Sequence, residues 1–239
     1  INEVITPLHA ATQNVIGIGL AMPGVVDGNG LVKRSTLLGW RNVDVRTLIE
    51  RRFSLPVTVN NDATAAMFTE RLFGKGGPNM MFVRLRRGVG GAVLLGDVPV
   101  FGENHAGGEI GHISLDPQGP PCACGKRGCL ERLVSATSLH ARLQRSDERM
   151  RASILREAGT YLGTALSMPV GLLDLADVCV YGQSDIVNDT LLSAAQAQLD
   201  LLTGSSFHTR TIIRRCECEG EITLRGEALS VLHDYLENR

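Results

Sequence analysis

One short stretch of this chain gathers the residue types that bind zinc. Between positions 108 and 131 it contains one histidine and three cysteines in the spacing H-x9-C-x-C-x4-C, namely His112, Cys122, Cys124 and Cys129. Three thiolates and one imidazole complete the tetrahedral shell that zinc prefers and leave no position open for a substrate water. Gly125 and Gly128 allow turns tight enough for the sulfurs to converge. The stretch therefore predicts a structural zinc site, and the alternative is a Pro/Gly loop with reduced cysteines.

Two carboxylates flank the predicted metal site. Glu109 precedes His112 by three residues, so one helical turn would place both side chains on the same face. Zinc on one ring nitrogen of His112 would fix the other nitrogen as an N–H donor for a ligand hydroxyl. Glu131 follows Cys129 by two residues and adds a second carboxylate. Two carboxylates and a fixed imidazole suit a polyol, so Glu109, His112 and Glu131 are predicted to bind a sugar.

The stretch from Gly108 to Glu131 resembles the signature of the ROK family, which contains sugar kinases and sugar-responsive repressors. The similarity is good over about residues 15 to 135 and weaker in the C-terminal third, and its other segments are 16–27, 37–40 and 55–66. It implies an α/β fold of the two-lobed, actin-like (ribonuclease H-like) sugar-kinase type, with the zinc knuckle in the second lobe. The first lobe is expected to comprise residues 1–62 and 226–239, and the second, with the oligomerisation helices, residues 63–225.

Hydrophobic periodicity independently predicts alternating strands and helices, which is typical of an α/β protein. The strands are expected at 15–22, 57–59, 80–85, 91–95, 178–181 and 211–215, and the helices at 1–11 (the end of one), 63–73, 133–143, 150–173 and 227–236. Cys216 and Cys218 are interpreted as strand-edge residues without a partner cluster, and Cys179 as a core residue.

The resemblance assigns sugar binding to Asn61 and Asp62 as well. In a kinase, Asp62 would be the catalytic base that takes the proton from a sugar hydroxyl during attack on a γ-phosphoryl group. An aspartate just before an alanine-rich helix is also a common helix N-cap, and this alternative stays open. Thr64 stands where family kinases usually carry a second asparagine.

The nucleotide side matches the family less well. Phosphates must be held by backbone N–H groups that small residues leave accessible. Where family kinases carry a glycine and a hydroxyl residue, this chain has Arg86 and Arg87, and Tyr181-Gly182-Gln183 replaces an expected Gly-Gly. The sequence therefore favours a sugar-responsive transcriptional regulator with a degenerate nucleotide site, so that enzyme activity is not expected. The alternative is an ATP-dependent hexose or N-acetylhexosamine kinase that uses Mg²⁺, and a third possibility is a protein-binding scaffold.

Composition limits the partners. A net charge of −1 gives no basic footprint for nucleic acid, so another segment would bind DNA. The resemblance implies that this segment lies upstream of Ile1. Three cysteines in a metal frame favour a reducing compartment, and the longest apolar region, 162–181, is too polar to span a membrane. We expect a cytoplasmic protein that binds a sugar or sugar phosphate, and the resemblance implies a homodimer or a higher homo-oligomer.

Overall fold

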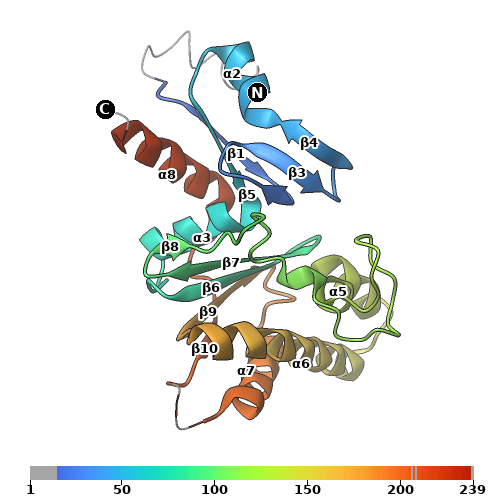
Figure 1. Cartoon of the computed structure of the whole chain (residues 1–239). Coiled ribbons are helices and arrows are strands. Elements are labelled where there is room, and N and C mark those ends of the chain that lie inside the picture. The colour runs from blue at the N-terminus through green and yellow to red at the C-terminus, as the bar shows by residue number, and fades with distance from the viewer. Residues whose placement is uncertain (1–14, 206, 208, 238–239) are drawn as a thin grey trace. The chain divides into compact units, whose positions relative to one another are not determined.

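The computed structural model describes residues 15–205, 207 and 209–237. They form two compact α/β units, shown in Figure 1. The first consists of the described residues up to Thr69 together with those from Gly220 onward, and the second is Glu70–Glu219. The helix end expected at 1–11 lies outside the described residues. No helix among them is long and apolar enough to cross a lipid bilayer.

The first unit is built around two neighbouring parallel strands. Strand β1 (Ile18–Met22) pairs with β5 (Val57–Asn61), so that Met22 lies opposite Asn61 at their carboxyl ends. Helix α8 (Ile222–Glu237) packs against both strands. Helix α3 (Asp62–Phe73) follows β5 without a break, which places polar residues where a strand ends and a helix begins.

An antiparallel sheet and a helix complete this unit. Its strands are β2, β3 and β4, with bounds Val25–Val26, Leu31–Ser35 and Trp40–Asp44. Helix α2 (Val45–Phe53) follows, capped by Asp44, whose carboxylate accepts a hydrogen bond from the Thr47 N–H. None of these elements was predicted, because β2 is too short and β4 too exposed to give an alternating hydrophobic pattern. Their small core consists of valines: Val26, Val32, Val45, Val57 and Val59.

The second unit contains a five-stranded sheet in the order β10-β9-β6-β7-β8. Strands β6, β9 and β10 are parallel, and β7 and β8 extend the sheet as antiparallel strands. The bounds are Met80–Leu85 for β6, Val89–Leu95 for β7, Val98–Pro99 for β8, Asp177–Gly182 for β9 and Ile212–Arg215 for β10. All the strands predicted here are present, and only the two-residue β8 was missed.

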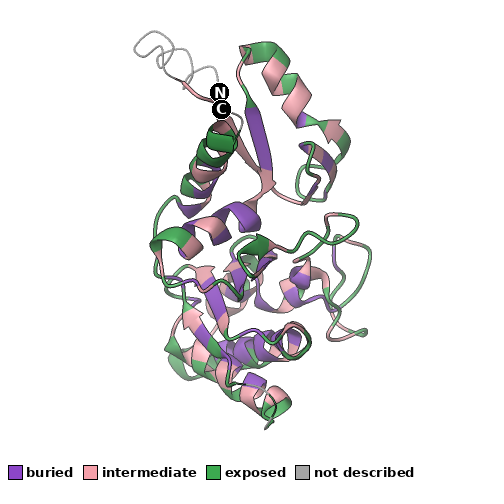
Figure 2. Cartoon of the chain, turned by 60° about the vertical axis from the view of Figure 1, so that its left-hand side comes forward, coloured by how far each residue is buried: buried purple, intermediate pink, exposed green. Residues whose placement is uncertain are grey.

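Two long helices cover one face of this sheet. Helix α6 (Glu148–Leu173) starts at Asp147, which accepts a hydrogen bond from the Met150 N–H, and packs along α7 (Asp189–Thr203). Their apolar faces form the main core with the sheet, and Figure 2 shows these buried positions in purple. Helix α7 was not predicted. The single helix expected at 133–143 is wrong, because Ser135 is extended and separates α4 (Leu130–Val134) from α5 (Ala136–Leu143).

We expect Leu166→Ala to lower the free energy of unfolding by about 3 kcal/mol, since Leu166 is fully buried on the core face of α6. Met168→Ala is the matched control, because Met168 lies two residues along the same helix and is 74% exposed. Its effect should stay below about 0.5 kcal/mol. Urea denaturation followed by circular dichroism measures both, and equal losses would contradict the assigned core face.

Candidate functional site

The histidine and three cysteines singled out in the sequence come together in the second unit. Cys122 Sγ lies 3.6 Å from His112 Nδ1, and the Sγ atoms of Cys124 and Cys129 are 3.6 Å apart. One ligand atom from each of the four residues lies within 4.8 Å of all the others. His112 ends a short 3-10 helix, η1 (Ile110–His112), and Cys129 directly precedes α4. The cluster therefore joins two helical segments that the intervening loop separates in sequence.

The geometry of the cluster fits a tetrahedral zinc ion. Zinc–sulfur bonds of about 2.3 Å and zinc–nitrogen bonds of about 2.0 Å place neighbouring ligand atoms about 3.5 to 3.8 Å apart. Burial, with the thiol hydrogen bonds from Cys124 and Cys122, raises the pKa of Cys129 to about 12. A thiolate at this position thus needs a nearby cation, and a structural zinc ion supplies that charge.

The loop backbone brings the sulfurs together. Leu115 N–H donates to Gly128 O, and Cys122 N–H donates to Lys126 O. Gly128 has a φ of 58°, and a Cβ there would lie 1.7 Å from the Asp116 carbonyl oxygen. Only glycine fits this close approach. The predicted role of glycine in turning the knuckle is seen directly in this contact.

The two ring nitrogens of His112 face different groups. Nδ1 is directed to the cysteine cluster, while Nε2 lies 3.8 Å from Glu109 Oε2. A metal on Nδ1 leaves Nε2 as the N–H donor, next to a carboxylate acceptor. This is the arrangement that the i,i+3 spacing predicted. A ligand hydroxyl between them could accept from the imidazole and donate to the carboxylate.

Glu131 connects the cysteine cluster with the β6–β7 hairpin. It lies in the first turn of α4, and its Oε2 accepts a hydrogen bond of 3.2 Å from the Val89 N–H. The sequence analysis assigned Glu131 to sugar binding alone. One of its oxygens also holds the hairpin turn, so this carboxylate fixes the turn relative to the cluster.

Asn61 and Asp62 lie at the end of β5 in the first unit. Asn61 Oδ1 accepts from the N–H groups of Ala63 and Thr64, and Asn61 Nδ2 donates to Gly24 O at 2.9 Å. Asn61 therefore caps α3, and the alternative in which Asp62 is the N-cap is wrong. Asp62 is the first residue of the helix. The structure describes these two residues within one unit, and Glu109, His112 and Glu131 within the other.

The turn between β6 and β7 stands where a kinase of the family would have its phosphate-binding loop, and it forms hydrogen bonds to other groups of this protein. Arg86 N–H donates to Gly88 O, and Arg86 O accepts from the Ala136 N–H at the start of α5. The Arg86 guanidinium lies over the Tyr181 ring, 5.7 Å from its centroid. Together with the bond from Val89 to Glu131, two N–H groups of the turn are thus already bonded.

A second cluster was missed by the sequence analysis, which gave Cys216 no partners. Cys216, Cys179 and Glu70 have ligand atoms within 4.8 Å of one another. Glu70 is fully buried, and its oxygens accept from Arg214 Nη1 at 2.6 Å and from Cys216 Sγ at 3.0 Å. Burial raises the pKa of Glu70, but these and backbone hydrogen bonds outweigh it, so the pKa lies below its usual value. A saturated carboxylate beside a guanidinium indicates a structural network rather than a metal site.

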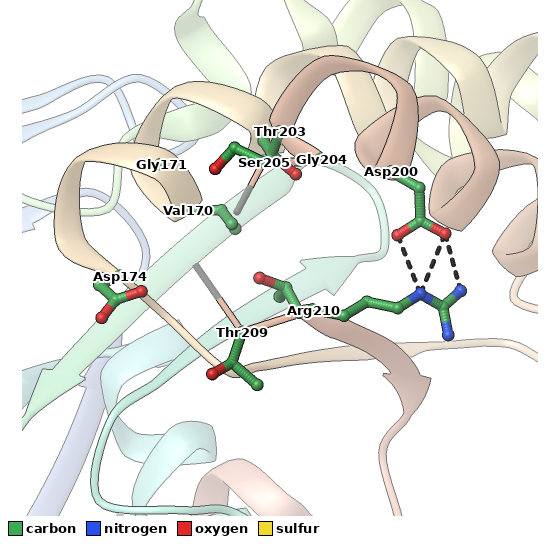
Figure 3. A pocket seen from close by; sticks show the side chains of 10 residues that line it. Val170, Gly171, Asp174, Asp200, Thr203, Gly204, Ser205, Thr209 and Arg210 are labelled. Carbon is green, nitrogen blue, oxygen red and sulfur yellow. Dashed lines mark hydrogen bonds and ion pairs between the residues drawn. The ribbon is translucent and has the colours of Figure 1, made fainter. Parts of the chain in front are cut away.

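A shallow cavity of about 290 Å³ lies elsewhere in the second unit, between the carboxyl ends of α6 and α7. Figure 3 shows Val170 and Asp174 on one side and the ion pair of Asp200 with Arg210 on the other. None of the residues predicted to bind sugar or metal lines it. The cavity is therefore separate from the candidate site.

The fold and the cysteine–histidine cluster define a sugar-kinase-like α/β protein with a cluster of four residues that could hold a zinc ion. Residues 1–166 match the ROK family, and the chain belongs to it. The resemblance noted in the sequence is thereby confirmed at the level of the family.

Relatives of two kinds are similar to the chain. It is 32% identical over 152 residues to the xylose repressor of Bacillus spizizenii, and 39% identical over 135 residues to the glucokinase of Halalkalibacterium halodurans. These alignments cover 63% and 55% of this chain, and the chain spans only 40% and 41% of the two relatives.

Solved structures show the same fold for both kinds. A ROK family transcriptional regulator has a TM-score of 0.84 at 23% identity, with 98% of this chain and 67% of that chain covered. A ROK glucokinase from Streptomyces griseus, in complex with glucose and AMPPNP, has a TM-score of 0.82 at 22% identity, with 97% and 87% covered. Regulators and kinases match equally well, so the likeness to these structures establishes the fold.

We expect the purified protein to contain close to one equivalent of zinc per chain, and Cys129→Ser to lose most of it, because that change removes a ligand at the fully buried position of the cluster. Cys218→Ser is the matched control, since Cys218 is a buried cysteine outside the cluster. Mass-spectrometric metal analysis measures the content. Equal zinc in both variants would contradict the site.

Proposed function

We propose that this chain is the sugar-binding and oligomerisation part of a ROK-type transcriptional regulator, and that it does not transfer phosphate. The observation that carries the proposal is the state of the β6–β7 turn. A kinase must present bare backbone N–H groups to the nucleotide phosphates, and here the Arg86 and Val89 N–H groups bond within the protein. The Arg86 side chain lies over Tyr181, at the carboxyl end of β9.

The residues proposed to bind sugar, by contrast, match the family and are held in place by neighbouring groups. Glu109 and the Nε2 of His112 face each other, and zinc would hold the imidazole in that orientation. Asn61 is fixed at the end of β5, where Asp62 follows. We assign a sugar or sugar phosphate to Asn61, Asp62, Glu109, His112 and Glu131. A binding protein needs these polyol contacts and no phosphate contacts, which accounts for the difference between the two sides.

DNA binding is assigned to a segment upstream of Ile1. This chain has a net charge of −1, and it spans two fifths of the xylose repressor that it resembles. A dimer follows from the two-fold symmetry of the operators that paired helix-turn-helix heads recognise. Sugar binding would then change the spacing of the heads. The coding sequence upstream of Ile1 tests this assignment, since a helix-turn-helix segment supports it and a short phosphate-binding loop contradicts it.

One observation favours an ATP-dependent sugar kinase as the second candidate. Asn61 caps α3 through its side-chain oxygen, and Asp62 follows it as the first residue of the helix. An aspartate at this position could act as the general base toward a sugar hydroxyl, with Mg²⁺ bound to the nucleotide. The hydrogen bonds of the β6–β7 turn and the position of the Arg86 side chain over Tyr181 disfavour a kinase.

Sugar binding without turnover is the test of the proposed function. In isothermal titration calorimetry against a panel of hexoses, N-acetylhexosamines, pentoses and their phosphates, we expect at least one ligand to bind. A coupled assay should detect no ADP release with ATP, Mg²⁺ and the same ligand. ADP release well above the no-sugar blank would establish the kinase instead, and binding of no panel member would favour a scaffold.

We expect Glu109→Gln to weaken the binding of that ligand about tenfold or more, because an amide accepts a hydroxyl hydrogen bond less strongly than a carboxylate. The zinc content should not change, since Glu109 is not in the cysteine–histidine cluster. Glu103→Gln is the matched control, an exposed glutamate six residues earlier. Titration calorimetry measures both variants, and equal affinities would remove Glu109 from the site.

A further inference from the structure

Glu227 is a buried carboxyl group next to the sugar-binding residues of the first unit. It lies on α8, is 2% exposed, and its Oε2 accepts a hydrogen bond of 3.2 Å from Asn60 Nδ2. Its Oε1 is buried without a hydrogen-bond partner among the described residues. Buried polar atoms are nearly always paired, and an unpaired carboxyl oxygen is costly. A group of this kind calls for a functional explanation.

The surroundings of Glu227 are apolar. Strand β1 contributes Gly19, where a Cβ would lie 2.8 Å from Glu227 Cβ, and β5 contributes Asn60. Neither strand contains an ionisable residue. Gly226, the residue before Glu227, lies against Ala65 of helix α3. The carboxylate of α3 that is nearest to Ala65 in sequence is Asp62. Burial raises the pKa of Glu227 to about 7, and the Asn60 hydrogen bond is the only contribution that lowers it.

Asn60 and Asn61 hold the end of β5 from both of its faces. Successive side chains of a strand point to opposite faces, so Asn60 reaches Glu227 while Asn61 reaches the Gly24 carbonyl. Asn61 also accepts the first N–H groups of α3. The position of Asp62, between that strand and that helix, therefore depends on both asparagines.

We propose that Glu227 is a positioning residue for the turn from β5 into α3, which contains Asn61 and Asp62. Glu227 holds this turn through Asn60 more firmly as a carboxylate than as a carboxylic acid, so that loss of its proton strengthens sugar binding. A hydrogen bond to an ionised acceptor is roughly twice as strong as a neutral one. The inference rests on the proposed function, because it concerns the same sugar site. It adds proton-linked control of affinity by a residue that does not touch the ligand.

The pH range of the effect follows from the pKa. Glu227 is protonated below about pH 6 and ionised above about pH 8. Because its pKa in the folded protein lies above the value of 4.5 for a free glutamate, ionisation destabilises the fold. That destabilisation is absent below about pH 4.5 and complete above about pH 7. Sugar affinity should change in the opposite sense, rising with pH.

The experiment is calorimetry at pH 6 and pH 8 with the sugar found for the wild-type protein. We expect about threefold tighter binding at pH 8 for the wild type, and equal binding at both values for Glu227→Gln, which keeps an acceptor for Asn60 but cannot ionise. The matched control, Glu221→Gln, changes an exposed glutamate directly before α8 and should keep the wild-type pH dependence. By reciprocity, the wild type should release protons on binding, visible as a buffer-dependent enthalpy.

Two outcomes would overturn the inference alone. One is a wild-type affinity that is flat or falls between pH 6 and pH 8. The other is a rise that persists in Glu227→Gln, which would show that a different group controls the affinity. Asn60→Ala provides a second check, since it should also remove the pH dependence.

A sugar-independent measurement separates this failure from that of the proposed function. The melting temperature of Glu227→Gln should exceed that of the wild type by an amount that grows from pH 4.5 to pH 7. A constant difference shows that Glu227 does not ionise in this range and overturns the inference. Binding of no sugar by the wild type at any pH overturns the proposed function, and this inference with it.

Discussion

The convergence of His112 with three cysteine sulfurs determines the ligand-facing part of the second unit. The loop from Ile113 to Gly128 contains no helix or strand, and isolated bridges and turn hydrogen bonds close it. The cluster holds η1 and α4 at the two ends of this loop. It thereby orients Glu109 beside the imidazole and Glu131 against the β6–β7 turn. A metal at the cluster would support the orientation of every candidate ligand residue in this unit.

In the first unit, amide and carboxyl side chains orient the candidate ligand residues. Asn61 is bonded to the Gly24 carbonyl and to the start of α3, and Asn60 is bonded to Glu227. Zinc coordination is strong and tolerates a loop with little regular structure, whereas single hydrogen bonds contribute about 1 kcal/mol each. The end of β5 relies on the adjacent strand and helix for the remaining rigidity. This difference explains why a protonation change at Glu227 could alter the turn in the first unit.

The proposed loss of nucleotide contacts and the proposed retention of sugar contacts would have separate physical causes. In the β6–β7 turn, the Arg86 N–H donates to Gly88 O and the Val89 N–H donates to Glu131, and the Arg86 side chain lies over the Tyr181 ring. The positions of the proposed sugar-binding residues depend on the cysteine–histidine cluster and on the end of β5. The β6–β7 turn belongs to neither. One half of a kinase-like site can therefore change while the other keeps its geometry.

The sequence by itself determined the α/β class, the cysteine–histidine cluster as candidate metal ligands, and most long elements. Zinc ligation and buried strands leave strong local patterns, namely a fixed Cys/His spacing and continuous apolar runs. Helix α7 and the β2–β4 sheet were missed, since short or half-exposed elements are stabilised by their neighbours and not by local propensity. Only the tertiary structure decided that Asn61 caps α3, that Glu70 accepts a hydrogen bond from Cys216, and that Glu227 meets Asn60 across 167 residues of sequence. Such partners come from elements distant in the chain, and no spacing rule connects them.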